Sequence, residues 1–154
     1  MKSFTSLFSI SSLPLTSLAF VLFLTGCAPG LKTVRIKPDS SVVGASVQVD
    51  VVPITAANQS VVDYPVSRYW LPGDPIRNSA IKKIKFDQLG LQTQTVSIPA
   101  GALSVAIIAD LPGLFNDAPG SGDPRRKILP AKGKGVLSSA DVVVSRSSVQ
   151  VVTP

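Results

Sequence analysis

The stretch "SVQVDV", residues 46 to 51, alternates polar and apolar side chains at every position. Successive side chains of an extended strand point to opposite faces, so the three valines fall on one face and Ser46, Gln48 and Asp50 on the other. This period of two predicts a β-strand with one apolar face and one polar face.

A second stretch, Leu103–Ala109, alternates in the same way, but both of its faces are largely apolar. A strand of this kind is typically central in its sheet and covered on both sides. We therefore expect Leu103, Val105 and Ile107, which share one face, to lie in the core.

Several other short segments read as strands, and Pro and Gly residues separate them. Further strands are predicted at Leu31–Lys37, Ile84–Phe86, Leu91–Ile98, around Lys127–Leu129, at 142–144 and at 149–151. Seven or eight short strands predict an all-β fold, a small transthyretin-like or immunoglobulin-like β-sandwich.

Three irregular segments interrupt this strand pattern. Within 91–98 the apolar side chains change from one face of the strand to the other, and a β-bulge would restore the alternation. A helical turn, with Asn78 as a possible cap, competes with strand before Ile84. Residues 61–70 hold both tyrosines and the only Trp, and we expect this segment to cross between the sheets.

The N-terminal segment ends at the only cysteine of the chain, Cys27. No charged residue lies between Lys2 and Lys32, and the dense apolar run covers Leu13–Leu24. This run is shorter than the ~20 residues of a membrane-spanning helix and fits the h-region of a secretory signal. The alternative is a transmembrane anchor with an incidental cysteine.

The end of that run, Leu24-Thr-Gly-Cys27, resembles the lipobox of bacterial lipoproteins. The resemblance implies cleavage before Cys27 and acylation of its thiol and amine. Residue 28 is Ala rather than Asp, which resembles sorting to the outer membrane. The chain then divides into a signal peptide at 1–26, a lipidated N-terminus with tether and first strand at 27–40, and a β-sandwich at 41–154.

Composition narrows the functional classes. The chain carries a net charge of +6, has no His, and all nine of its acidic residues are Asp. Without His or a free thiol, the usual nucleophile–base pairs and zinc ligand sets are missing. We expect no enzyme, no metal or cofactor, and no nucleic-acid partner for an exported chain. An envelope enzyme using Asp carboxylates stays as an alternative, with Asp74, Asp110, Asp117 and Asp123 as its candidates.

Two loops share the sequence Leu-Pro-Gly and the sequence Gly-Asp-Pro. An Asp before Pro accepts backbone N–H bonds in the following turn, and a nearby guanidinium can pair with it. We therefore interpret Asp74, Arg77 and Asp123 as residues of structural turns, and we expect Trp70 to be structural as well. The competing interpretation is a binding surface built from both loops, with Arg125, Arg126 and Tyr69 as the partner-binding candidates.

Basic residues gather at Arg125-Arg126-Lys127 and at Lys132 and Lys134. Two interpretations are open: contact with anionic lipid headgroups or cell-wall polymer, or a solvated loop without a partner.

In combination, these motifs resemble a group of uncharacterised bacterial outer-membrane lipoproteins. The layout also resembles, more weakly, the TssJ lipoproteins of type VI secretion systems. That resemblance implies a lipidated cysteine followed by a transthyretin-like sandwich that docks the periplasmic part of an inner-membrane partner. The matching motifs are Tyr69-Trp70, Pro72–Pro75 with Arg77, Ala109–Gly113, Asp123–Arg126 and Ile128–Pro130.

We therefore expect a lipid-anchored lipoprotein of the outer membrane that faces the periplasm. It would bind the membrane through acylated Cys27 and serve as a structural or protein-binding assembly component with an envelope protein as partner. The alternative within this class is a TssJ-like secretion lipoprotein proper.

Overall fold

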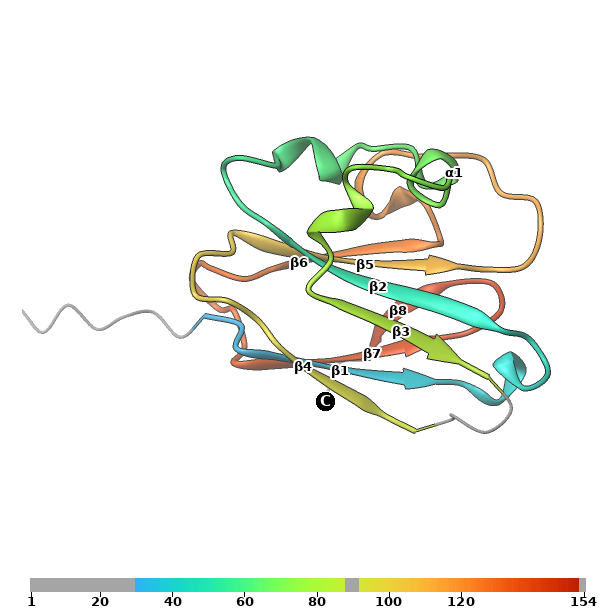
Figure 1. Cartoon of the computed structure of the whole chain (residues 1–154). Coiled ribbons are helices and arrows are strands. Elements are labelled where there is room, and N and C mark those ends of the chain that lie inside the picture. Colours follow the sequence, from blue (N-terminus) through green and yellow to red (C-terminus); the bar gives the residue numbers. More distant parts are fainter. Residues whose placement is uncertain (1–29, 88–91, 153–154) are drawn as a thin grey trace, which may run out of the picture.

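The computed structural model describes residues 30–87 and 92–152, and these residues form a β-sandwich of two four-stranded sheets (Figure 1). We call the sheet with strand order β4-β1-β7-β8 the first sheet and the sheet with order β3-β2-β5-β6 the second sheet. The first sheet consists of β1 (Thr33–Pro38), β4 (Gln94–Ser97), β7 (Ser139–Val144) and β8 (Val149–Val152). The second consists of β2 (Val47–Ile54), β3 (Lys82–Phe86), β5 (Ser104–Asp110) and β6 (Arg126–Pro130). The all-β prediction is confirmed.

The main core lies between the two sheets and follows the predicted alternation. Val47, Val49 and Val51 of β2 are fully buried there, opposite Val34 and Ile36 of β1 within one apolar cluster. The strand β1 pairs parallel with β7 and antiparallel with β4, so it is an inner strand of the first sheet. The sandwich therefore begins at β1, ahead of residue 41.

The strand β5 lies between β2 and β6 and is covered on both faces, as its sequence predicted. Val105 and Ile107 face the main core, and Ala106 and Ile108 belong to a second apolar cluster on the outside of the same sheet. The prediction for Leu103 was wrong, because its side chain is 38% exposed. Leu103 precedes the strand, at the end of the sheet, where the facing strands no longer cover it.

The segment that we expected to cross between the sheets does not do so. Residues 55–81 connect β2 to β3, which are neighbours in the second sheet, and fold over the outer face of that sheet (Figure 1). This covering segment contains η2 (Gln59–Val62), the single-turn helix α1 (Val66–Tyr69) and η3 (Arg77–Ser79). Its buried Val61, Val66 and Tyr69 pack against the second apolar cluster, which forms because both faces of β5 are apolar.

A helical turn does precede Ile84, but it is η3 at Arg77–Ser79 with Ile76 as its N-cap, so Asn78 lies inside the turn and does not cap it. The remaining short helices are η1 (Ser40–Val42) and η4 (Gly120–Gly122). The strand β4 is shorter than predicted, and the proposed bulge near Leu91 falls partly on 88–91, outside the described residues.

Strand directions give the sandwich two distinct ends. The described chain starts at Gly30, at the end that also carries the loops 98–103 and 131–138; we call this the proximal end (Figure 1). The loops 39–46, 111–125 and 145–148 lie at the opposite, distal end. Within the described part of the chain, no helix is long and apolar enough to cross a bilayer.

Candidate functional site: three arginine networks and a distal groove

Arg126 is only 1% exposed, and its guanidinium joins two loops. It donates to the carbonyl oxygens of Ala118 (2.6 Å) and Gly120 (2.7 Å) in the β5–β6 loop, and to those of Val61 (3.4 Å) and Tyr64 in the covering segment. No carboxylate pairs with it in the described structure, and burial lowers the pKa of Arg126. Arg126 thus acts as an internal donor that ties the covering segment to the β5–β6 loop.

Arg125 forms a second connection between the same two segments. Its guanidinium donates to Asp123 Oδ1 and Oδ2 (3.0 and 2.7 Å) and to Asp117 Oδ1 (2.6 Å), and it lies over the ring of Phe115. Asp117 in turn accepts from the backbone N–H of Ser67 (2.9 Å) and from its hydroxyl. The start of α1 is therefore fixed to the β5–β6 loop through a carboxylate.

These contacts shift the ionisation of the carboxyl groups. Burial raises the pKa of Asp117, but the hydrogen bonds from Ser67 and Arg125 outweigh it and leave that pKa below its usual value. The same balance, with Arg125 as the donor, lowers the pKa of Asp123. The hydrogen bond to Asp123 raises the pKa of Arg125. Both carboxylates are thus held in the charged form by their partners.

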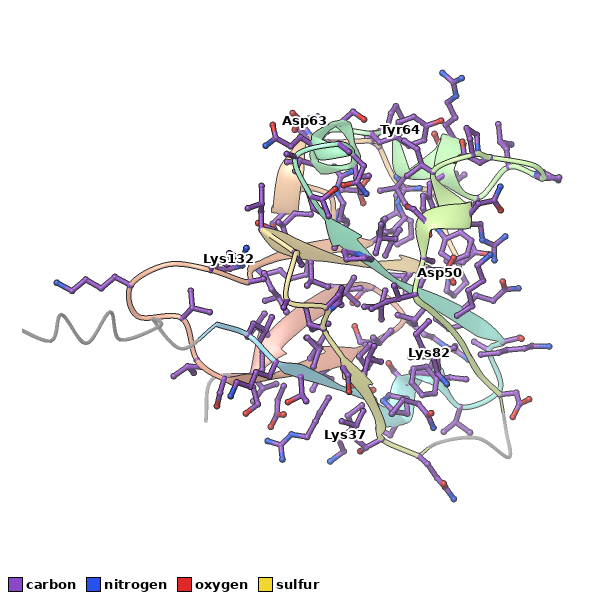
Figure 2. The ribbon with its side chains drawn as sticks, turned by 60° about the vertical axis from the view of Figure 1, so that its left-hand side comes forward. Lys37, Asp50, Asp63, Tyr64, Lys82 and Lys132 are labelled. Atoms are coloured by element: carbon purple, nitrogen blue, oxygen red, sulfur yellow. The ribbon has the colours of Figure 1, made fainter. Side chains whose placement is uncertain are left out.

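A third network lies between the second sheet and the covering segment. Asp50 on β2, labelled in Figure 2, is 1% exposed. It accepts from the Tyr69 hydroxyl (2.9 Å) and from Arg77 Nε (3.0 Å). Arg77 also donates to Gln48 (2.8 Å) and stacks on the Trp70 ring, 4.5 Å from its centroid. Burial, followed by the nearby Asp50 charge, raises the pKa of Tyr69 strongly. Of the polar face of "SVQVDV", Asp50 is therefore buried in an internal polar network, Gln48 is half-buried and Ser46 is exposed.

Both predicted structural turns are present, and the nearby arginine pairs with the turn Asp in the second turn but not in the first. Asp74 Oδ1 accepts from the backbone N–H of Ile76 (2.9 Å) and of Arg77 (3.3 Å), and Asp123 Oδ1 accepts from that of Arg125 (2.9 Å). The Arg77 guanidinium pairs with Asp50 rather than with Asp74. The second oxygen of Asp74 accepts instead from the Tyr64 hydroxyl (2.6 Å).

The three partner-binding candidates are not at the surface. Tyr69, Arg125 and Arg126 are 1%, 7% and 1% exposed, and their polar atoms are engaged within the chain. Little of these side chains is accessible to a partner, because the covering segment closes over the outer face of the second sheet. They hold the loops in place rather than offering free side chains to a partner.

The distal end carries a groove instead. It has a volume of about 450 Å³ and is lined by Gly44–Ser46, Asp110–Pro112 and Arg146. Arg146 fixes one wall: its backbone N–H donates to the Ser41 hydroxyl (3.1 Å), and its guanidinium donates to the carbonyl of Val43 (3.0 Å).

Two exposed apolar side chains flank this groove. Leu114, three residues after Leu111, is 104% exposed, and Val43 is 48% exposed. Contiguous exposed apolar surface marks protein-interaction sites, so we take the groove together with these two side chains as the candidate interaction surface of the distal end. This surface was not predicted from the sequence; the Leu-Pro-Gly-Leu order at 111–114 was the available signal, since Pro and Gly favour a turn there and Gly113 adopts a positive φ.

Among the described residues, no group of three or more His, Cys, Asp or Glu side chains is placed to hold a metal ion. Three of the four aspartates considered for an envelope enzyme, Asp74, Asp117 and Asp123, accept hydrogen bonds within the loops. The fourth, Asp110, lies at the end of β5 and lines the distal groove.

Neither a protein-family model nor a curated protein sequence matches this chain significantly. Solved structures do match. Serratia marcescens Lip, described as a membrane-bound component of the type VI secretion system, superposes with a TM-score of 0.54 at 15% identity, over 82% of this chain and 99% of Lip.

Two further matches come from the same kind of assembly. A chain of a structure described as the T6SS protein TssM C-terminal domain from EAEC gives a TM-score of 0.56 at 14% identity, over 79% of this chain and 99% of that one. A chain of a type VI membrane complex gives 0.50 at 15% identity, over 80% and 99%. At these identities the comparisons show a shared fold, and the weak resemblance stated from the sequence is confirmed at that level.

Proposed function

We propose that this protein is a lipid-anchored lipoprotein of the bacterial envelope that docks another envelope protein through its distal end. One observation carries the proposal: the described chain starts at one end of the sandwich, and the exposed Leu114 and Val43 flank a groove at the other (Figure 1). An anchor at the proximal end would hold that groove away from the membrane.

The proposed anchor is Cys27, with residues 1–26 as the signal peptide. Acyl chains contribute about 0.8 kcal/mol per buried CH₂, and more than one chain gives stable attachment. Residue 28 supports the outer membrane as the destination, with the sandwich in the periplasm. In cells fed a fatty-acid probe, the wild-type chain should be labelled and should fractionate with outer membranes, whereas Cys27→Ser should be neither labelled nor cleaved. Labelling of the Ser variant would contradict the anchor.

The proposed partner is the periplasmic part of an inner-membrane component of a type VI secretion system. The likeness to Lip and to a chain of a type VI membrane complex supports this choice. A structural or assembly role elsewhere in the envelope is the broader form of the proposal. The aspartate-dependent enzyme has less support, because three of its four candidates are engaged in loop contacts.

Charge placed on the distal end should abolish docking without unfolding the protein. Val43→Asp and Leu114→Asp should each leave the urea unfolding midpoint unchanged and reduce recovery of the partner from envelope extracts about tenfold or more, as the loss of an interface anchor does. Val152→Asp is the matched control, since Val152 is 46% exposed but lies on β8. Equal loss in the control would contradict a distal docking site.

A further inference from the structure

The proximal end carries lysines that the proposed function does not use. Lys32, Lys132 and Lys134 are exposed there, and none of them forms an ion pair within the described residues. Figure 2 shows Lys132 at this end of the sandwich. The proximal loops that hold them, 30–32, 98–103 and 131–138, contain no acidic residue, and Asp141, the acidic residue nearest to them in sequence, pairs with Arg35. The charged side chains of these loops are therefore all basic.

Backbone contacts fix these lysines beside the start of the described chain. Leu31 N–H donates to the Ala131 carbonyl (3.0 Å), and Lys32 N–H donates to the Ser138 carbonyl (2.8 Å). Gly30 lies so close to Ala131 that a Cβ on it would approach the Ala131 carbonyl oxygen to 2.8 Å, and a side chain there would force the loop away. The loop that carries Lys132 and Lys134 is thus packed directly on the chain that leads to Cys27.

The length of that leading chain limits how far the lysines can lie from a membrane. Cys27 is three residues before Gly30, and an extended chain spans at most ~3.3–3.6 Å per residue, so this connection covers about 10 Å or less. The Debye length at physiological salt is about 8 Å. The tether is thus at most of the order of one Debye length, so an acyl anchor at Cys27 holds the long lysine side chains of the proximal end close to the lipid headgroups.

We propose that the proximal surface, defined by Lys32, Lys132, Lys134 and the 56% exposed Leu137, docks on anionic phospholipid headgroups as a second membrane contact. This inference rests on the acyl anchor proposed above. Basic residues close to an anionic bilayer are attracted to it, and an apolar side chain beside them can enter the interface. Such a contact fixes the orientation of the sandwich and points the distal groove into the periplasm.

The test uses the mature acylated protein, added to preformed vesicles of phosphatidylcholine alone or of phosphatidylcholine with phosphatidylglycerol. A membrane-impermeant amine reagent labels exposed lysines, and mass spectrometry reads each site. On the anionic vesicles, labelling of Lys32, Lys132 and Lys134 should slow several-fold and recover at high salt. Labelling of Lys82, Lys83 and Lys85, which are exposed on the edge strand β3, should not change.

A charge-matched variant separates local docking from a whole-protein charge effect. The triple substitution K82Q/K83Q/K85Q removes as many charges as K32Q/K132Q/K134Q would, and it should leave the slowing at the three proximal lysines intact. Equal labelling of those lysines on both vesicles would overturn the proposed surface, as would a uniform slowing of all lysines or its loss in K82Q/K83Q/K85Q. Failure to associate with the phosphatidylcholine vesicles would instead overturn the acyl anchor, and the docking with it.

Discussion

At the scale of single residues, Arg126 shows how a cation can serve as a structural element. Its side chain is buried without a carboxylate in the described structure, and it donates to carbonyl oxygens of two separate loops. Loop carbonyl oxygens that are buried away from water need hydrogen-bond donors, and one guanidinium supplies several N–H donors in a fixed geometry. A lysine offers fewer donors from a single atom and cannot span the same set.

Arg126→Ala should therefore be strongly destabilising. Each buried carbonyl left without a donor costs about 1–3 kcal/mol, so we expect a loss of about 3–5 kcal/mol in the free energy of unfolding by urea. Lys85→Ala, at an exposed position on β3, is the control and should change stability by less than ~0.5 kcal/mol. A loss below ~1 kcal/mol for Arg126→Ala would show that the loops hold together without it.

Asp117 and Asp123 should make stability sensitive to acid. Their pKa values are lowered in the folded state, so the stabilisation that they provide is complete above the unfolded value of 3.8 and is lost as pH falls through the folded values. The urea midpoint should stay level from pH 7 to about pH 5 and fall below about pH 4.

Removal of Arg125 tests the cause of that acid sensitivity. Arg125→Gln should lower stability at pH 7 and flatten the decline at low pH, because both carboxylates lose a charged donor. Arg35→Gln breaks the exposed ion pair with Asp141 and should leave the decline in place. An unchanged decline in the Arg125 variant would mean that other groups are responsible.

At the scale of elements, alternation predicted the strands of the main core but not what covers the second sheet. The pattern placed Asp50 on a polar face, and the connecting chain 55–81 buries this side chain through Tyr69 and Arg77. The signal was in the strand itself: after Asp50, β2 continues as Val-Val-Pro-Ile, apolar on both faces. Which segment covers a face depends on long-range packing, which periodicity does not contain.

Long-range packing also decides which groups the arginine side chains contact, and this could not be predicted from the sequence. Local turn chemistry located Asp74 and Asp123 correctly, since an Asp before Pro bonds the backbone just after it. The guanidinium partners of Arg77 and Arg126 come from distant segments, Asp50 on β2 and the carbonyls of 61–64. Spacing along the chain carries no information on such contacts.

Val105 on β5 and Leu103 just before this strand test where the strand begins. Val105→Asp would bury an unpaired carboxylate between the sheets and should cost several kcal/mol or prevent folding. Leu103→Asp should be tolerated within about 1 kcal/mol, because that side chain is already 38% exposed. Chemical unfolding followed by circular dichroism would measure both, and equal losses would place Leu103 back in the core.

At the scale of the whole molecule, the two ends of the sandwich differ in chemistry. Each end carries a groove of similar volume, and they differ in their lining: Lys32 and Lys132, which form no ion pair within the described residues, line the proximal groove, whereas Asp110 and Arg146 line the distal one. Between them, the arginine networks hold the covering segment and the β5–β6 loop in one arrangement. The proposed anchor at Cys27 and the proposed docking at the distal end would use these opposite ends to connect a membrane to a partner.

Site-specific photo-crosslinking in intact cells tests this polarity most directly. A photoreactive amino acid replaces Leu114 at the distal end, Val152 on β8, or Leu137 at the proximal end, all three exposed. Our account predicts that Leu114 yields an adduct with the periplasmic part of an inner-membrane type VI secretion protein, identified by mass spectrometry, and that Val152 and Leu137 do not. A protein adduct from Leu137 or Val152 and none from Leu114 would contradict it.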